Sequence, residues 1–273
     1  KISYRKAIEL KPDYAEVYFN LGITLHELGN LKDAKKNYRK AIALKSDFEE
    51  AIYNLGVMLY EGNELKKAME QFKLIDFRMS KSNLLKCFYI QDQQSNFYKH
   101  LDDMINKSQN NAVIGSLVSR SNIRYGLDKI NPFCNEPLRY LLKVDLTKQY
   151  DFKTIFLNGV KGIMGDNKIR NTIHGLLSSG TQTAGNVFSQ VNLATDLIQK
   201  TIRLEVEKYR THFKDSNEGF IKNWPNDYTL YGWVVSMQNG GQLAPHIHDS
   251  AWLSGSIYIN VPPKLKSDSG NLV

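Results

Sequence analysis

Two histidines two positions apart are the sharpest chemical signal in the sequence. They lie in Pro245-His246-Ile247-His248, which we expect to be an extended segment. On a strand, residues i and i+2 project to the same face, so both imidazoles would point into one volume. Imidazole nitrogen suits iron, zinc and copper. The spacing predicts that His246 and His248 bind one metal ion, although two surface or core histidines at this spacing would need no metal.

Polar residues after the histidines add to this signal. We expect a strand over residues 254–261, SGSIYINV. Its polar side chains would share one face: Ser254, Ser256, Tyr258 and Asn260. A polar inward face beside two histidines is typical of a small-ligand cavity inside a β-barrel. The same side chains could instead be interior groups whose hydrogen bonds neighbouring strands satisfy.

The histidines lie in a part of the chain that we expect to be β-structure. Short segments rich in β-branched and aromatic residues occur at 229–237, 243–248 and 254–261. Before them, apolar residues at helical spacing predict a long amphipathic helix from Ala194 to Phe213. The polar stretch 175–188 predicts a loop or a short strand pair. We assign residues 151–273 to this β-domain.

The N-terminal part of the sequence repeats with a period of 34 residues. Asn20-Leu21-Gly22 recurs as Asn54-Leu55-Gly56, and Ala34 recurs as Ala68. Each unit predicts two amphipathic helices, as over 15–29 and 31–44. We expect the small residues where the two helices cross, because a larger side chain would push them apart. Asn20 and Asn54 could bind a peptide backbone or fix the packing of the helices.

Between these parts, residues 77–150 keep the helical spacing but lose the repeat, so we predict a helical extension that includes 137–144. A further helix is predicted over 150–164. The expected fold class is α+β.

Composition excludes several classes of protein. The net charge of the 273 residues is +8, but no block of like charges suggests a dedicated nucleic-acid surface. No apolar run approaches the ~18 residues of a membrane span, so no membrane partner is expected. The 2 cysteines, Cys87 and Cys134, are too few for a disulfide framework. We therefore expect free thiols in a reducing, cytoplasmic location.

Residues 1–76 resemble the tetratricopeptide repeat in their Asn-Leu-Gly and Ala positions. The resemblance implies an α-solenoid whose concave face holds a protein or peptide. In that register the sequence opens inside the second helix of a repeat, so we expect that Lys1 is not the natural N-terminus.

Residues 170–273 resemble the iron(II)/2-oxoglutarate-dependent oxygenases, most specifically in YGWVVSMQNGGQLAPHIHDSAWLSGSIYINVPP. The resemblance is to a bacterial and phage group with His-x-His followed by Ser-Gly. It implies an incomplete double-stranded β-helix (a jelly-roll), with iron(II) as cofactor and 2-oxoglutarate as co-substrate. In this resemblance His246 and His248 are catalytic metal ligands, and Ser256 and Tyr258 donate hydrogen bonds to the carboxylate of 2-oxoglutarate.

Two features depart from the family pattern. The second ligand is usually Asp or Glu, whereas here it is His248, which leaves a two-histidine site, a tri-histidine site or another metal such as zinc open. The distal histidine and the Arg or Lys that pairs with 2-oxoglutarate would come after Val273. We therefore expect a chain truncated at both ends that does not turn over as given. The predicted function is a dioxygenase (hydroxylase) whose repeats recruit its substrate or partner; the alternative is a non-catalytic tetratricopeptide adaptor for protein–protein interaction.

Overall fold

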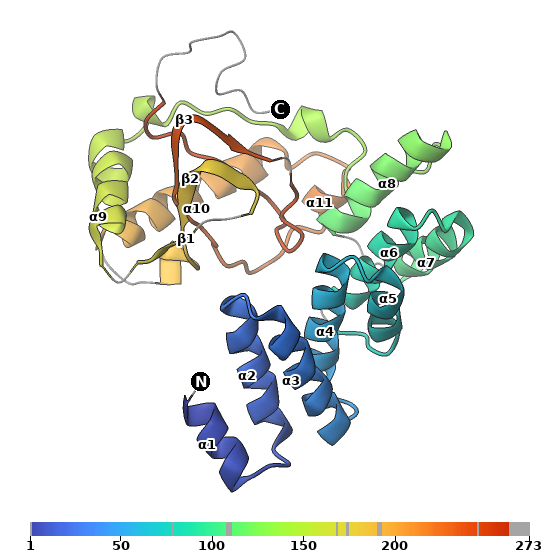
Figure 1. Cartoon of the computed structure of the whole chain (residues 1–273). Coiled ribbons are helices and arrows are strands. Elements are labelled where there is room, and N and C mark those ends of the chain that lie inside the picture. Colours follow the sequence, from blue (N-terminus) through green and yellow to red (C-terminus); the bar gives the residue numbers. More distant parts are fainter. Residues whose placement is uncertain are drawn as a thin grey trace. The chain divides into compact units, whose positions relative to one another are not determined.

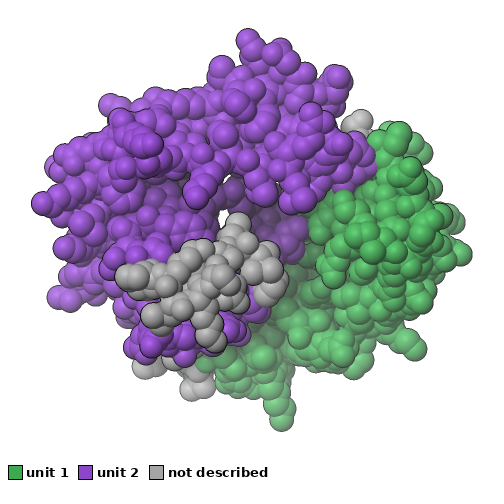
Figure 2. Space-filling view, turned by 90° about the horizontal axis from the view of Figure 1, so that it is seen from above, with its two compact units in different colours: residues 1–130 green, residues 131–273 purple. Residues whose placement is uncertain are grey.

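The computed structural model describes residues 2–77, 79–107, 111–167, 169–172, 175–189, 193–244 and 246–261. The chain forms two compact units, residues 1–130 and 131–273 (Figure 2). The finer division into 1–76, 77–150 and 151–273 stays a prediction. Residues 262–273, at the end of the predicted β-domain, lie outside the described residues.

The first unit is a stack of helices. In chain order they are α1 (Ile2–Leu10), α2 (Ala15–Glu27), α3 (Leu31–Leu44), α4 (Glu49–Glu61), α5 (Leu65–Lys73), α6 (Ser80–Ile90), α7 (Gln94–Asn106) and α8 (Ala112–Tyr125) (Figure 1). Each helix from α1 to α6 packs against the next one, and α8 packs against α6. Helices α2 and α3 confirm those predicted over 15–29 and 31–44. The prediction of an N-terminal α-solenoid is therefore confirmed.

The repeated glycines lie against aromatic rings that repeat with the same period. A Cβ atom on Gly22 would lie 2.7 Å from Cδ1 of Tyr38, and one on Gly56 would lie 2.6 Å from Cε1 of Phe72. Both rings are almost fully buried. The expectation that helix crossing requires small residues here is confirmed, because a methyl group has no room at either position.

The two repeat asparagines differ in their surroundings. Asn20 is exposed, whereas the half-buried Asn54 makes a side-chain hydrogen bond with Tyr38. Burial is the main cause that raises the pKa of Tyr38 to about 12. Asn54 therefore serves the packing between helices, which was one of its two predicted roles.

The second unit contains helices and a small sheet. Its longer helices are the π-helix η3 (Lys153–Asn158), α9 (Gly159–Gly165) and α10 (Leu193–His212). Its short helical turns are η1 (Pro137–Tyr140), η2 (Leu146–Lys148), η4 (Val187–Ser189) and α11 (Gly219–Lys222). Helix α10 confirms the helix predicted from Ala194 to Phe213. The helix predicted over 137–144 is wrong beyond the short turn η1. Tyr140 packs against an apolar cluster, but Leu138, Leu141 and Leu142 are exposed, so no continuous apolar face is buried there.

The sheet has three antiparallel strands in the order β1–β2–β3 (Figure 1). They are β1 (Asn171–Thr172), β2 (Leu177–Thr183) and β3 (Val235–Leu243). Strand β2 lies within the stretch 175–188, for which a loop or a short strand pair was predicted. Within the described residues we find no second sheet of a double-stranded β-helix. The antiparallel sheet is thus observed, and the jelly-roll remains a proposal.

The strands near the histidines differ from the prediction. Strand β3 runs through Asn239-Gly240-Gly241, where a turn was expected, while the described residues of 244–248 and 254–261 form no strand. Pairing with β2 ends where Leu177 lies opposite Leu243. One further bond joins the Ala244 amide to the Leu176 carbonyl at 2.8 Å. Beyond this point the chain has no neighbouring strand among the described residues, and a strand needs such a partner to satisfy its backbone groups.

Two apolar clusters hold the segment that carries the histidines. Val234, before β3, and Ile259, after the histidines, pack against a cluster of Phe156, Ile163, Val187 and Ile198. Trp252 packs against a second cluster formed by Cys134, Tyr209, Phe220 and Ile221. The segment is therefore anchored on both sides of the histidines.

Cys87 and Cys134 are buried free thiols, as the cysteine count predicted. Burial is the main cause that raises the pKa of each thiol to about 11. In the part of the chain that the structure describes, no helix combines the length and the apolar character needed to cross a membrane.

Candidate metal centre

The rings of His246 and His248 converge just after strand β3. Their Nε2 atoms lie 3.0 Å apart, and the ring centroids are 4.9 Å apart at an angle of 60°. His246 is exposed and His248 is half-buried. The predicted convergence is thus observed, although a loop and not a strand produces it.

A turn after the histidines brings the chain back to His248. The Ala251 amide donates to the His248 carbonyl at 3.0 Å, and the Trp252 indole donates to the Phe220 carbonyl at 2.9 Å. The returning chain places Ser254 Oγ 2.8 Å from His248 Nδ1. The ring of His248 is therefore held at both nitrogens.

Hydrogen bonds determine which nitrogen of His246 can bind a cation. Its Nδ1 lies 2.8 Å from the carbonyl oxygen of Ala244, which can only accept. Nδ1 therefore carries the proton, and in the neutral ring Nε2 offers a lone pair. A backbone carbonyl on the second nitrogen is the usual way in which proteins orient a metal-binding histidine.

The distance between the two Nε2 atoms fits a shared metal ion. Two nitrogens at about 2.1 Å from a metal and at right angles lie about 3.0 Å apart, whereas a tetrahedral angle separates them by about 3.4 Å. The observed separation of 3.0 Å lies close to both values. The pair can therefore hold one metal ion without a large movement of either ring.

The surroundings of His248 favour its neutral form. Burial and the nearby His246 lower the pKa of His248, and Asp249 opposes this effect. The Trp233 ring meets the imidazole edge to face, with centroids 5.1 Å apart at 89°. A lowered pKa keeps the imidazole unprotonated, which is the form that binds a metal.

Polar residues of β2 and the loop after it hold the segment that carries Trp233. Thr183 Oγ1 accepts from the Val234 amide at 2.9 Å. Asn186 Oδ1 accepts from the Gly232 amide at 3.0 Å, and its Nδ2 donates to the Leu230 carbonyl at 3.0 Å. Thr183 and Asn186 belong to the polar stretch 175–188, whose residues could reach the site by their place in the sequence, but their spacing matches no motif that predicts this role.

Ser256 and Tyr258 are placed differently from their predicted positions. Their segment is not a strand, both residues are exposed, and Tyr258 is 56% exposed. Within the described part of the chain, neither makes a hydrogen bond or a ring contact with the histidine pair. Ser254, from the same predicted face, does make one. Alternation along a strand would have placed all three together, but a loop has no such period.

His246 and His248 are the two candidate metal ligands that the described residues bring together. No group of three or more His, Cys, Asp or Glu side chains that could hold a metal is found within the described ranges. The facial triad of non-haem iron oxygenases has three protein ligands. The described residues thus offer candidates for two of these three positions.

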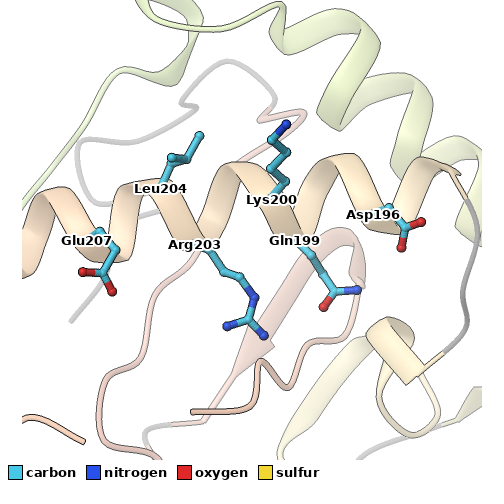
Figure 3. A pocket seen from close by; sticks show the side chains of 6 residues that line it. All are labelled: Asp196, Gln199, Lys200, Arg203, Leu204 and Glu207. Carbon is cyan, nitrogen blue, oxygen red and sulfur yellow. The ribbon is translucent and has the colours of Figure 1, made fainter. Parts of the chain in front are cut away.

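A separate recess lies on the exposed face of α10 and has a volume of about 440 Å³ (Figure 3). Its lining residues all come from this helix: Asp196, Gln199, Lys200, Arg203, Leu204 and Glu207. The guanidinium of Arg203 stacks over the Tyr228 ring at 4.9 Å. The two basic side chains, Lys200 and Arg203, lie between Asp196 and Glu207 along the helix, and the four do not converge, so this recess offers no constellation for chemistry.

Comparison with protein families finds matches at both ends of the chain. The family described as "TPR repeat" matches residues 3–29 and 24–62. The family described as "Putative 2OG-Fe(II) oxygenase" matches residues 231–271, a range that contains both histidines, Trp233 and Ser254. No curated protein matches the chain.

Solved structures similar to the chain include repeat proteins. A structure of MamA is 18% identical with a TM-score of 0.42, covering 45% of this chain and 75% of its own. YrrB, titled a TPR protein with an unusual peptide-binding site, is 20% identical with a TM-score of 0.38, covering 45% and 68%. PilF of Pseudomonas aeruginosa is 16% identical with a TM-score of 0.39, covering 83% of both chains. Such TM-scores carry no argument about function. By the family matches, the chain contains tetratricopeptide repeats in its N-terminal part and, around the histidine pair, a segment that matches the 2OG-Fe(II) oxygenase family.

Proposed function

We propose that the second unit carries the metal-binding part of an iron(II)/2-oxoglutarate-dependent oxygenase, with His246 and His248 as ligands. The observation that carries this proposal is the 3.0 Å approach of the two Nε2 atoms inside the segment that the oxygenase family matches. The proposed complete fold around the site is a double-stranded β-helix. The proposed reaction is a hydroxylation.

The residues of the chain have distinct roles in this proposal. The Ala244 carbonyl fixes the His246 ring so that Nε2 faces the ion. Trp233 covers one side of His248 and limits access of water to it. When bound, iron(II) with 2-oxoglutarate supplies the oxidation of a carbon–hydrogen bond by oxygen. We keep Ser256 and Tyr258 as proposed donors to 2-oxoglutarate, because their exposed hydroxyl groups can meet a ligand that arrives from solvent.

The repeats suggest how a substrate is recruited. Residues 3–62 match the tetratricopeptide family, whose stacked helices are associated with protein–protein interaction. We propose that the repeats bind a protein or peptide, and that a side chain of this partner is the hydroxylated group. We also propose a cytoplasmic location, since both cysteines are free thiols.

Coupled binding of metal and 2-oxoglutarate tests the oxygenase proposal. The full chain is titrated with iron(II) without oxygen, in the presence and absence of 2-oxoglutarate, and tryptophan fluorescence is followed because Trp233 touches His248. Two protein ligands predict weak metal binding that 2-oxoglutarate tightens, since each ligand must raise the affinity of the other. His246→Ala and His248→Ala should both abolish this coupling.

A matched control is His26→Ala, which removes a histidine of α2 in the first unit. This variant should bind iron(II) and 2-oxoglutarate like the wild type. An equal metal affinity in all four proteins, or an affinity that 2-oxoglutarate does not change, would contradict the proposal.

The alternative is a non-catalytic adaptor that acts through its repeats. The intact helical stack of the first unit favours it, as does the absence of a third metal ligand among the described residues. The adaptor proposal predicts peptide binding by the first unit that is the same with and without iron(II), together with no coupling between iron(II) and 2-oxoglutarate.

A further inference from the structure

We propose that Ser254 is a positioning residue that bonds Nδ1 of His248 and so holds the ring with Nε2 toward the metal. This inference rests on the proposed function, because it takes His246 and His248 as the ligands. Ser254 is the serine of the Ser-Gly pair that follows the histidines in the sequence. The observation is the 2.8 Å contact between Ser254 Oγ and His248 Nδ1.

The contact is built by the fold and does not follow from sequence proximity alone. Ser254 lies six positions after His248, and the turn closed by the bond from the Ala251 amide to the His248 carbonyl reverses the chain between them. Trp252 fixes this loop through its bond to the Phe220 carbonyl and its packing against Phe133, with ring centroids 5.2 Å apart. The Ser254 hydroxyl is therefore presented to the ring by an anchored loop.

Nδ1 of His248 contacts a hydroxyl group, whereas Nδ1 of His246 contacts a backbone carbonyl. The Ala244 carbonyl can only accept, so it permits a single neutral form of His246, with the proton on Nδ1. A serine hydroxyl can donate or accept by rotating. Ser254 can therefore satisfy His248 Nδ1 in both neutral forms of the ring.

Each neutral form of His248 corresponds to one state of the site. Without a metal, two lone pairs facing each other at 3.0 Å would repel, so His248 Nε2–H donates to His246 Nε2 and Nδ1 accepts from Ser254. With a metal, both Nε2 atoms offer lone pairs, and Nδ1–H of His248 donates to Ser254. The change removes one proton from Nε2 and adds one to Nδ1 through solvent, so the net charge of the ring is unchanged.

Ser254 thus stabilises the form of His248 that binds a metal, and it does so without leaving the metal-free form unsatisfied. Removal of such an outer hydrogen bond typically lowers metal affinity by about 10- to 100-fold. We expect a loss of that size in Ser254→Ala. Ser254→Thr keeps a hydroxyl on the same carbon and should restore most of the affinity.

The matched control is Ser236→Ala, since Ser236 is also an exposed serine of the second unit, on strand β3, and has no proposed role in binding. The four full-length proteins, wild type, Ser254→Ala, Ser254→Thr and Ser236→Ala, are titrated with iron(II) without oxygen. In parallel, the ¹⁵N chemical shifts of the His248 ring are recorded without metal and with zinc(II). Ring shifts report the position of the proton, which a purely structural loss of stability would not move.

The proposal predicts weaker iron(II) binding and an altered Nδ1 shift in Ser254→Ala, both restored in Ser254→Thr and unchanged in Ser236→Ala. Wild-type affinity and wild-type ring shifts in Ser254→Ala would overturn it. So would equal losses in Ser254→Ala and Ser236→Ala. If the wild type and His246→Ala bind iron(II) equally, the proposed function fails instead, and the metal-free ring shifts of Ser254→Ala still decide whether Ser254 controls the His248 proton.

Discussion

Gly232→Ala tests how the structure positions Trp233 against His248. Gly232 precedes Trp233 and packs on the Phe188 ring, where an added Cβ would lie 2.4 Å from Cε2 and 3.0 Å from Cζ. Carbon atoms in ordinary contact are about 3.5 Å apart, so the ring or the backbone must move by roughly 1 Å. Phe188 packs against the apolar cluster around Phe156, which limits its own movement.

This displacement lowers the free energy of unfolding. Overpacking of this kind destabilises a protein by about 1–3 kcal/mol. The shift also strains two hydrogen bonds, from the Gly232 amide to Asn186 Oδ1 at 3.0 Å and from the Val187 amide to the Gly232 carbonyl at 2.9 Å. Alanine also lowers the conformational entropy of the unfolded chain relative to glycine, which offsets about 0.4–1 kcal/mol of this destabilisation. We expect the free energy of unfolding to fall by about 1–3 kcal/mol.

The same shift should move Trp233 away from His248 and weaken iron(II) binding by about tenfold, within the range for a disturbed outer shell. Urea denaturation gives the stability, and the tryptophan emission spectrum reports the environment of Trp233. The control is Gly255→Ala, because nothing lies within 4 Å of a Cβ at that position. A wild-type denaturation midpoint and emission spectrum in Gly232→Ala would refute this account of the Gly232–Phe188 contact.

Two further predictions concern the first unit. Gly56→Ala should destabilise the protein by about 1–2 kcal/mol in urea denaturation, because the added Cβ would lie 2.6 Å from Phe72. The control, Gly162→Ala in α9, should not destabilise it, since nothing lies within 4 Å of a Cβ there. Equal denaturation midpoints for the two variants would contradict the packing argument. Burial lowers the pKa of His100 in the folded protein, so as the pH falls His100 is protonated in the unfolded chain before it is protonated in the folded one. The free energy of unfolding should therefore fall as the pH drops below about 6.5, by at most about 1.4 kcal/mol per pH unit. His100→Phe should reduce this slope, and an unchanged slope would show that His100 is not its source.

The solenoid could be predicted because its sequence signal is local and repeated. Gly22 and Gly56 share one phase, and Tyr38 and Phe72 share another, so one packing contact occurs twice in the sequence. Helical spacing also predicted α10 correctly, since its apolar face follows the helical period. Over 137–144 the same spacing produced only the turn η1, because Leu138, Leu141 and Leu142 stay exposed and apolar spacing alone does not make a helix.

The strands near the metal centre could not be predicted with the same success. Apolar and polar residues alternate over 254–261, but a strand also requires a neighbour with which its backbone can pair, and the sequence does not identify that neighbour. The convergence of His246 and His248 was predicted correctly on a strand argument that does not hold. Ser254 was predicted to face the histidines from a strand, whereas it contacts His248 from a loop. This contact depends on a turn at 248–251 that no motif indicated.

The most direct test of the central claim is the location of a metal ion in crystals of the full chain soaked with iron(II) without oxygen. Anomalous scattering recorded on both sides of the iron absorption edge identifies the element and its position. We predict a single peak between His246 and His248, about 2.1 Å from each Nε2 atom. Anomalous density elsewhere in the protein, with none at this pair of nitrogens, would contradict the claim that these two histidines form a metal centre.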